Sequence, residues 1–336
     1  MPDRARWWGL AAGAVLLAVV AVIALRPRGD ATHPASPLQG GRPIAGDTIL
    51  FVIYSPPSSP WGQTLNAIKA AKAITGVRVR VTYASTDRQL VAVIQAGIAA
   101  HVAGMALDVP SPAADSAICA ASDAGIPVVA WNTNGYGPAA ARCVLAYMGS
   151  DLVGAGRAIT QYLARRGKIK RGAHVFCPVE LPHAAYAKRR AQGVDSVLSS
   201  YGARCDVVGV GFPDAEEQAK MLRYLRRHPG TDLMIPVGGT PLANAPAVLK
   251  RLGRRLPVVG FDIADGSTTR IIDGIEHGDI LATIDQQFYS QGFQSVMQLA
   301  LYLKYGLFPS NVDTSDNSVV DDTNAGLAAS LSGTYR

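Results

Sequence analysis

Residues 257–289 hold two short apolar segments that end on polar side chains. The first reads Pro257-Val-Val-Gly-Phe-Asp262 and the second reads Ile280-Leu-Ala-Thr-Ile-Asp-Gln-Gln-Phe-Tyr289. Because residues 267–278 between them have the pattern of one helix, this stretch predicts a strand–helix–strand unit of a parallel sheet. In such sheets ligands bind beyond the carboxyl ends of the strands, where Asp262 and Gln286 are expected. A carboxylate at this point can also simply cap the next helix.

The same alternation of strands and helices runs through most of the chain in two successive blocks, which predicts an α/β fold of two doubly wound, Rossmann-like lobes. The expected strands of the first block are residues 49–53, 77–83, 102–108, 125–132 and 145–149. Those of the second block are residues 173–178, 207–210, 233–237, 257–262 and 280–286. The polar strand ends of both blocks could then face one cleft, and clefts between domains are favoured ligand sites.

Composition and motifs narrow the function. The 336 residues are 49% hydrophobic and carry a net charge of +7, but the basic residues form no cluster interleaved with aromatics, so we expect no nucleic-acid partner. The six histidines lack paired metal spacing, and the segment Gly209-Val-Gly211 lacks the third glycine of a dinucleotide fingerprint. No Gly-x-Ser-x-Gly nucleophile motif occurs either. We therefore expect no cofactor, no metal and no enzymatic activity.

The N-terminus predicts export. An uninterrupted apolar run from Trp7 to Leu25 is flanked by arginines. It is longer than the ~7–15 residues of a signal-peptide core and close to the ~20 residues that span a bilayer. We expect residues 1–26 to be a signal or membrane anchor and residues 27–46 to be a flexible linker. The folded part would then lie in the periplasm or at the cell surface, tethered to the cytoplasmic membrane by residues 7–25 if the segment is not cleaved.

The four cysteines leave two possibilities open, because none has the close spacing of a metal or redox motif. Two disulfides and four buried thiols both fit the sequence. If the folded part is exported to an oxidising compartment, we expect Cys177 to pair with Cys205 and Cys119 to pair with Cys143.

Six segments together resemble the type I periplasmic sugar-binding proteins, the ribose-binding-like solute receptors of ABC importers, which are related to the ligand domain of the LacI regulators. The segments are Gly125-Ile-Pro-Val-Val-Ala-Trp-Asn132, Met148-Gly-Ser-Asp151, Arg190-Ala-Gln-Gly193, Val258-Val-Gly-Phe-Asp262, Ala282-Thr-Ile-Asp-Gln-Gln287 and Asp322-Thr-Asn324. The resemblance implies a monomer of two lobes joined by a three-segment hinge. The N-terminal lobe would be 47–150 plus 287–314 and the C-terminal lobe 151–286 plus 315–326, with 327–336 as a tail.

The resemblance also implies which residues bind the ligand. On the first lobe these are Ser59, Trp61, Gly62, Asp108, Asn132 and Thr133. On the second lobe they are Arg190, Phe212, Gly238, Asp262 and Gln286. Carboxylates, amides and a guanidinium suit hydroxyl groups, and aromatic rings suit the apolar faces of a sugar. Taken singly, each of these residues could instead have an ordinary role as a core aromatic, a helix cap or a solvated charge.

Two departures from the family pattern bear on the ligand. Gly238-Gly239 stand where relatives commonly carry Asn-Asp, which predicts a roomier or wetter pocket. Asn132-Thr133 stand where ribose binders have Asp-Arg, which argues against D-ribose. We therefore expect a protein that captures a sugar or polyol by lobe closure and delivers it to an ABC permease and ATPase. The alternative is a membrane-tethered sensor that acts on a histidine kinase or chemoreceptor.

Overall fold

The computed structural model describes residues 40–57, 61–264, 266–315 and 318–336. The expected anchor, most of the expected linker and Ser59 lie outside these residues. No helix of the described part is both long enough and apolar enough to cross a bilayer.

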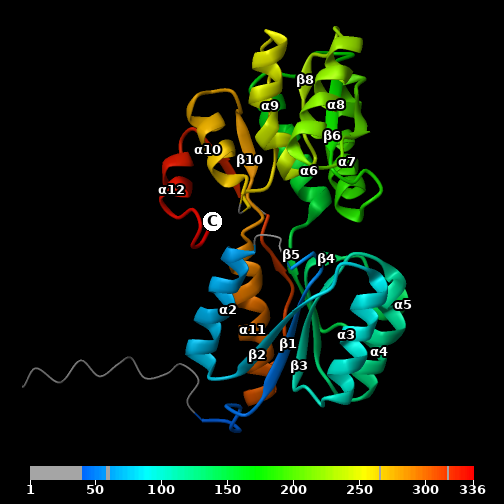
Figure 1. Cartoon of the computed structure of the whole chain (residues 1–336), viewed down its shortest axis with the longest axis vertical. Coiled ribbons are helices and arrows are strands. Elements are labelled where there is room, and N and C mark those ends of the chain that lie inside the picture. Colours follow the sequence, from blue (N-terminus) through cyan, green and yellow to red (C-terminus); the bar gives the residue numbers. More distant parts are fainter. Residues whose placement is uncertain (1–39, 58–60, 265, 316–317) are drawn as a thin grey trace, which may run out of the picture. The chain divides into compact units, whose positions relative to one another are not determined.

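The first lobe, in the lower half of Figure 1, is built on a six-stranded sheet with the order β11-β5-β4-β3-β1-β2. All of its neighbouring strands are parallel. The strands are β1 (Thr48–Ile53), β2 (Arg78–Tyr83), β3 (Gly104–Val109), β4 (Val128–Asn134), β5 (Ala146–Gly149) and β11 (Val312–Asp313). The helices are α2 (Gly62–Thr75), α3 (Asp87–Ala99), α4 (Asp115–Asp123), α5 (Pro138–Ala141) and α11 (Phe288–Tyr305).

Helices cover both faces of this sheet, as the uniformly apolar strands predict. Successive side chains of a strand point to opposite faces. In β1, Ile49, Phe51 and Ile53 are therefore buried with α2 and α11, while Leu50 and Val52 are buried with α3 and α4. Figure 1 shows α2 and α11 on one side of β1 and α3 and α4 on the other.

The second lobe repeats this architecture with two three-stranded sheets, ordered β7-β6-β8 and β12-β10-β9. A single bridge between Met234 and Val258 connects them, so the strands run in the order β7-β6-β8-β9-β10-β12. Apart from the antiparallel β12, the strands are parallel. The strands are β6 (His174–Val179), β7 (Arg204–Gly209), β8 (Leu233–Met234), β9 (Val259–Phe261), β10 (Ala282–Ile284) and β12 (Val319–Asp321). The helices are α6 (Leu152–Arg165), α7 (Ala185–Leu198), α8 (Asp214–Arg227), α9 (Gly239–Leu252), α10 (Thr268–Glu276) and α12 (Ala325–Ser330).

Three connections join the lobes: β5 to α6, β10 to α11, and β11 to β12. Hydrogen bonds hold the connections together. The Ser150 hydroxyl donates to the Gln286 side-chain oxygen at 3.3 Å, and the Gln287 side-chain amide donates to the Thr314 carbonyl at 2.7 Å. The three connections therefore form one hinge, as expected for this fold class.

Both ends of the described chain pack more closely than the sequence predicts. The backbone N–H of Arg42 donates to the Lys304 carbonyl, and Ile44 is buried against α2 and α11. The packed part of the chain thus begins before residue 47. The predicted tail starts inside α12, and its Tyr335 ring lies 4.7 Å from that of Tyr289, at the start of α11. The amide of Asn66 donates to backbone carbonyls of the same tail.

Both expected disulfides are present, which decides between the two possibilities left open by the sequence. Cys119 and Cys143 are bonded within the first lobe, with their Cα atoms 5.1 Å apart. Cys177 and Cys205, on the neighbouring strands β6 and β7, are bonded within the second lobe at 5.8 Å. The predicted pairing is confirmed.

Candidate functional site

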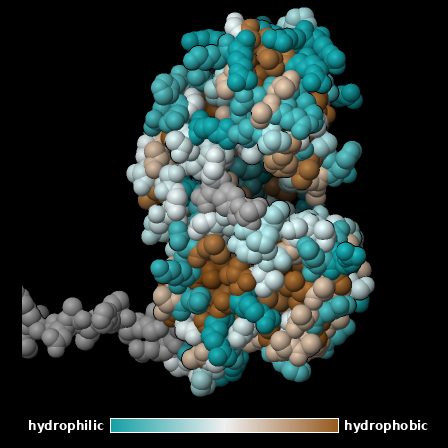
Figure 2. All heavy atoms as spheres, in the orientation of Figure 1, coloured by the Kyte–Doolittle hydropathy of each residue, from teal (hydrophilic) through white to brown (hydrophobic). Residues whose placement is uncertain are grey.

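A cavity of about 610 Å³ lies between the two lobes, at the carboxyl ends of their parallel strands. Figure 2 shows the surface hollowed between the two lobes. The residues that line the cavity come from both lobes and from the hinge: Ser55, Trp61, Asn132, Thr133, Leu152, Glu180, Leu181, Tyr186, Arg190, Phe212, Asp214, Gly239, Thr240, Asp262, Ala264, Gly266, Ser267, Arg270, Gln286 and Phe288.

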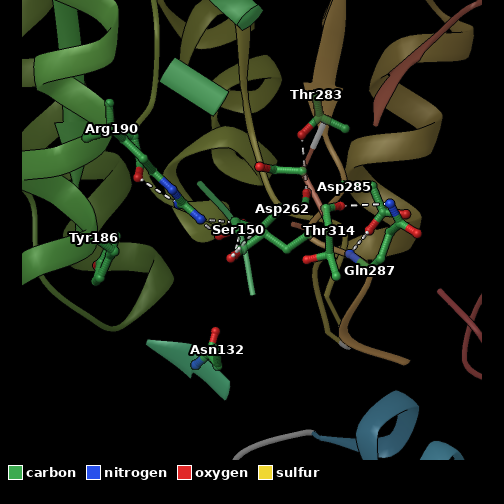
Figure 3. Close-up of polar contacts among 12 residues, drawn as sticks. Asn132, Ser150, Tyr186, Arg190, Asp262, Thr283, Asp285, Gln287 and Thr314 are labelled. Atoms are coloured by element: carbon green, nitrogen blue, oxygen red, sulfur yellow. Dashed lines mark hydrogen bonds and ion pairs between the residues drawn. The ribbon is translucent and has the colours of Figure 1, made fainter. Parts of the chain in front are cut away.

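An ion pair dominates the second-lobe wall. Arg190 of α7 and Asp262, which follows β9, point toward one another in Figure 3. Arg190 Nη2 donates to Asp262 Oδ1 at 2.7 Å, and Nη1 donates to Oδ2 at 3.1 Å. Because the two bonds are parallel, the pair is bidentate, which fixes both orientation and charge. The predicted Arg190–Asp262 pair is therefore present.

The surroundings lock this pair in place. The Arg190 side chain is only 2% exposed, its Nη1 also donates to the Val237 carbonyl at 2.9 Å, and its guanidinium lies 4.6 Å from the centre of the Phe261 ring. Gln286 of the hinge donates its side-chain amide to Asp262 Oδ1 at 2.5 Å. The buried Arg190 Nε–H has no acceptor among the described residues. Buried donors normally have a partner, so this unpaired N–H is an exception within the site.

On the first-lobe wall, a buried carboxylate orients two polar side chains. Asp108, in β3, accepts hydrogen bonds from the Asn132 amide at 3.1 Å, from the Thr133 hydroxyl at 2.5 Å and from the Tyr54 backbone N–H at 3.2 Å. Burial raises the pKa of Asp108 to about 6, although these three donors lower it. Asp108 itself does not reach the cavity, whereas Asn132 and Thr133 do.

Backbone strain marks the same strand ends. Asn132, Asp262 and Gln287 have φ values of 57°, 78° and 55°, in the left-handed region that side chains other than glycine rarely adopt. Such strain persists where the surrounding structure imposes it and is concentrated at functional sites. Asn132 lies two residues before the end of β4, Asp262 directly follows β9, and Gln287 comes three residues after β10.

Aromatic rings form the apolar part of the wall. Trp61, just before α2, packs edge-on against two other rings, with its ring centre 5.5 Å from that of Trp131 and 5.2 Å from that of Phe288. Its indole N–H donates to the Ser55 hydroxyl at 2.8 Å. Phe212 lines the second-lobe side and is 56% exposed. A ring this exposed is not a core residue, so the structural alternative for Phe212 does not hold.

Seven of the predicted site residues line the cavity: Trp61, Asn132, Thr133, Arg190, Phe212, Asp262 and Gln286. Gly62, Asp108 and Gly238 are close to it in the chain or in space but do not line it. Gly62 is the first residue of α2, Asp108 supports its two neighbours from behind, and Gly238 precedes α9.

A second set of polar side chains on the second-lobe wall was not predicted from the sequence. Glu180, Tyr186 and Thr240 line the cavity beside Arg190. Glu180 directly follows β6, so an acidic residue at a strand end was the signal that could have revealed it. A Cβ atom on Gly238 would lie 1.8 Å from Glu180 Oε2. The Glu180 side chain therefore occupies the space beside Gly238, and the roomier or wetter pocket expected there stays a prediction.

This arrangement suits a neutral, hydroxyl-rich ligand. Asn132, Thr133, Arg190, Asp262 and Gln286 offer hydrogen-bond donors and acceptors from both sides, and the rings of Trp61 and Phe212 offer apolar faces. Among the described residues, no group of three or more His, Cys, Asp or Glu side chains could hold a metal ion.

Comparison with known proteins identifies the family. The model of the family described as periplasmic binding protein domain matches residues 49–307. The chain therefore belongs to the periplasmic binding protein domain family. This confirms the family that the sequence segments indicated and makes the chain a binding protein rather than an enzyme.

Individual relatives of this periplasmic binding protein share less than a third of their residues with it. It is 28% identical over 244 residues to a xylose/arabinose-binding protein of Sulfolobus acidocaldarius, and the match covers 68% of this chain and 59% of that relative. A carbohydrate transporter of Acidothermus cellulolyticus, solved with myo-inositol, has a TM-score of 0.75 and 26% identity, covering 86% of this chain and 98% of that one. A solute-binding protein of an ABC transporter from Burkholderia graminis, solved with D-arabinose, has a TM-score of 0.74 and 20% identity, covering 84% and 98%.

Proposed function

We propose that the protein is an extracytoplasmic solute-binding protein that captures a sugar or polyol in the cavity between its lobes and delivers it to an ABC-type importer. One observation carries the proposal. The buried Arg190 guanidinium, fixed by Asp262 and with its Nε–H unpartnered, lines a cavity whose opposite wall presents Asn132 and Thr133. Groups from both lobes can therefore bind one ligand, and closing the lobes would bring them onto it.

The relatives support a neutral polyhydroxyl ligand. Their ligands are a pentose in the Sulfolobus and Burkholderia proteins and the cyclitol myo-inositol in the Acidothermus protein. In this chain Arg190 already has Asp262 as its counter-ion, so the ligand need not supply a negative charge. The same pair can bind adjacent hydroxyl groups through the remaining lone pair of Asp262 and the free N–H of Arg190.

A thermal-shift screen with D-xylose, D-arabinose, D-glucose, D-galactose and myo-inositol tests this function. A ligand present at a hundred times its dissociation constant stabilises the folded state by about 2.7 kcal/mol, so a true ligand raises the unfolding temperature clearly. The tightest probe is then measured by titration calorimetry. If no probe in this panel stabilises the protein, the proposed ligand class is wrong.

Asn132→Gly is the first site variant to test. The substitution removes the side-chain amide from the cavity, and glycine accepts the φ of 57° without strain. Because a hydrogen bond to ligand is lost, we expect calorimetry to show binding about tenfold weaker, while the unfolding temperature changes little. The exposed Lys250→Ala is the matched control and should leave binding unchanged. Equal affinity of Asn132→Gly and the parent would contradict the placement of the first-lobe wall.

The location and the partner follow from the same proposal. We infer that the folded part lies outside the cytoplasm, tethered or released according to the fate of residues 7–25. N-terminal sequencing of the membrane fraction decides this, since a start near Ala31 would show cleavage. Affinity capture from solubilised membranes distinguishes the partners: recovery of a permease and ATPase supports import, and recovery of a histidine kinase or chemoreceptor supports the sensor alternative.

A further inference from the structure

Glu180 stands at the point of the second lobe where the strand order reverses. It follows β6, and the chain continues from β6 to β7 on one side while β8 lies on the other. In open α/β sheets ligands bind in the crevice outside the strands at this switch point. On the first lobe the same point, between β1 and β3, is where Asp108 accepts the Tyr54 N–H and orients the cavity wall. Each lobe therefore has a carboxylate at its switch point, Asp108 on the β3 side in the first lobe and Glu180 after β6 in the second.

Unlike Asp108, Glu180 lines the cavity. Its Oε1 accepts from the Thr240 backbone N–H at 2.9 Å and lies 3.0 Å from the Thr240 hydroxyl. Its Oε2 accepts from the Tyr186 hydroxyl at 3.0 Å. Oε1 thus caps the start of α9, where Gly238 brings no side chain to do so. Oε2 has one partner fewer, and a lone pair remains on it.

Glu180 forms no ion pair with any described residue, and its partners are hydroxyl and backbone N–H groups. The Thr240 hydroxyl also lies 2.6 Å from Glu217 Oε2, and it has one hydrogen to share between two carboxylates. Burial raises the pKa of Glu217, and Glu180 raises it further. The other two carboxylates at the cavity each have a counter-ion: Asp262 pairs with Arg190, and Asp214 pairs with Arg270.

We propose that Glu180 is a ligand-binding residue that sets specificity, with Oε2 accepting a hydrogen bond from a hydroxyl group of the bound sugar or polyol. The proposal rests on the proposed function. Gly238 is glycine because any side chain there would displace this carboxylate. Since Arg190 and Asp262 occupy the adjacent part of the same wall, the ligand presents at least one hydroxyl beyond those that this ion pair binds.

Two variants separate ligand binding from helix capping. Glu180→Gln keeps an oxygen for the Thr240 N–H but puts an amide donor in the place of Oε2. Gly238→Ala keeps the charge but pushes it aside, because its Cβ would lie 1.8 Å from Oε2; its φ of −137° suits alanine. Glu216→Gln removes an exposed charge, paired with Lys220 on the surface of α8, and is the control.

The measurement is titration calorimetry of the full chain with the tightest of D-xylose, D-arabinose, D-glucose, D-galactose and myo-inositol, and with its monodeoxy analogues. We expect both variants to bind at least about tenfold more weakly than the parent, because the charged acceptor is lost in Glu180→Gln and displaced in Gly238→Ala. Glu216→Gln should bind as well as the parent. One monodeoxy analogue should bind the parent weakly. Glu180→Gln should bind that same analogue no more weakly than the parent does, since the two changes remove the same hydrogen bond.

The outcomes divide cleanly. If Glu180→Gln and Gly238→Ala bind the probe and every analogue as the parent does, Glu180 only caps α9 and the inference is overturned. The inference is also overturned if, for every monodeoxy analogue, the loss of affinity from the missing hydroxyl adds to the loss caused by Glu180→Gln. If none of the five probes binds the parent, the proposed function fails, and this inference fails with it.

Discussion

Arg190 and Asp262 illustrate how the proposed binding site constrains the interior around it. A buried ion pair contributes little net stability, but removing one partner leaves an uncompensated charge. The Arg190 side chain is 2% exposed and that of Asp262 is 15% exposed, so water cannot adequately solvate either charge when its partner is removed. The residues best suited to bind a ligand are therefore also residues that the fold cannot lose cheaply.

Asp262→Ala should show this cost. We expect the free energy of unfolding in urea to fall by about 3–5 kcal/mol, because the buried guanidinium loses its counter-ion. Asp214→Ala is the matched control, since it breaks the Arg270–Asp214 pair, whose side chains are 40% and 50% exposed. Exposed pairs contribute about 0–1 kcal/mol, so the control should be nearly silent. Similar losses in the two variants would contradict the buried character of the Arg190 site.

Cavity residues at the ends of strands could be predicted from the sequence. Cavity residues that helices or indirect contacts place there could not. Asp262 and Asn132 directly follow apolar runs, Gln286 comes one residue later after its strand, and all three line the cavity. Tyr186 and Thr240 lie on or near helix starts, where nothing in the local pattern distinguishes a ligand contact from a solvated side chain. Glu180 follows a strand as well, but its place in the cavity also depends on the absence of a side chain at Gly238, which is distant in the sequence and does not show in the pattern around Glu180.

Helices α6 and α7 pack unusually closely, and this contact positions Arg190. A Cβ on Gly156 would lie 2.2 Å from the Arg190 carbonyl, and one on Gly193 would lie 2.1 Å from the Val153 carbonyl. Neither backbone atom can move without moving its helix. The segment Arg190-Ala-Gln-Gly193 therefore combines the site arginine with the glycine that allows its helix to approach α6.

Gly193→Ala should push α7 away from α6. We expect a loss of about 1–3 kcal/mol in the free energy of unfolding, as for other overpacked interiors, together with weaker ligand binding because Arg190 shifts. Gly230→Ala is the control, because a Cβ there meets no atom within 4 Å. It should change the free energy of unfolding by less than about 0.5 kcal/mol. Unchanged stability and affinity in Gly193→Ala would show that the helices can separate freely.

Element order was predictable, while element ends were less so. Every expected strand is present within a few residues, because β-branched apolar runs between helical segments leave few alternatives. The expected strand at residues 233–237 is regular only over Leu233–Met234, although the N–H groups of Ile235 and Val237 still donate to β6. Pro236 has no N–H to donate to a neighbouring strand. The short β11 and β12 have no apolar run of their own and are defined by pairing with distant strands.

On the scale of the whole molecule, the C-terminal segment contacts both lobes. It leaves α12, which packs against the second lobe, and reaches Asn66 and Tyr289 on the first. Its Arg336 Nε lies 3.2 Å from Asp285 Oδ2, in the hinge shown in Figure 3. The sequence predicted a tail here because a few small and polar residues after the last helix carry no pattern. These contacts exist only once the lobes have folded.

Arg336 therefore affects the stability of the folded protein through the charge of the hinge carboxylate Asp285. Burial raises the pKa of Asp285 to about 6, although the Gln287 N–H and Arg336 lower it. Because the folded pKa lies above the unfolded value of 3.8, the contribution of Asp285 to stability is present below about pH 4 and is lost as pH rises through about 6. Without Arg336 the folded pKa rises further, so this loss continues to higher pH.

Arg336→Met should thus destabilise the protein in a pH-dependent manner. At pH 4.5, where Asp285 is protonated in the folded state, the variant and the parent should have nearly equal free energies of unfolding in urea. At pH 8 the variant should be less stable by about 1–2 kcal/mol, a modest value because the arginine is partly exposed. Arg42→Met, which breaks the more exposed pair with Asp47, is the control and should show a small difference at both values. A loss in Arg336→Met that is equal at pH 4.5 and pH 8 would mean that the segment acts by packing alone and leaves the hinge carboxylate unaffected.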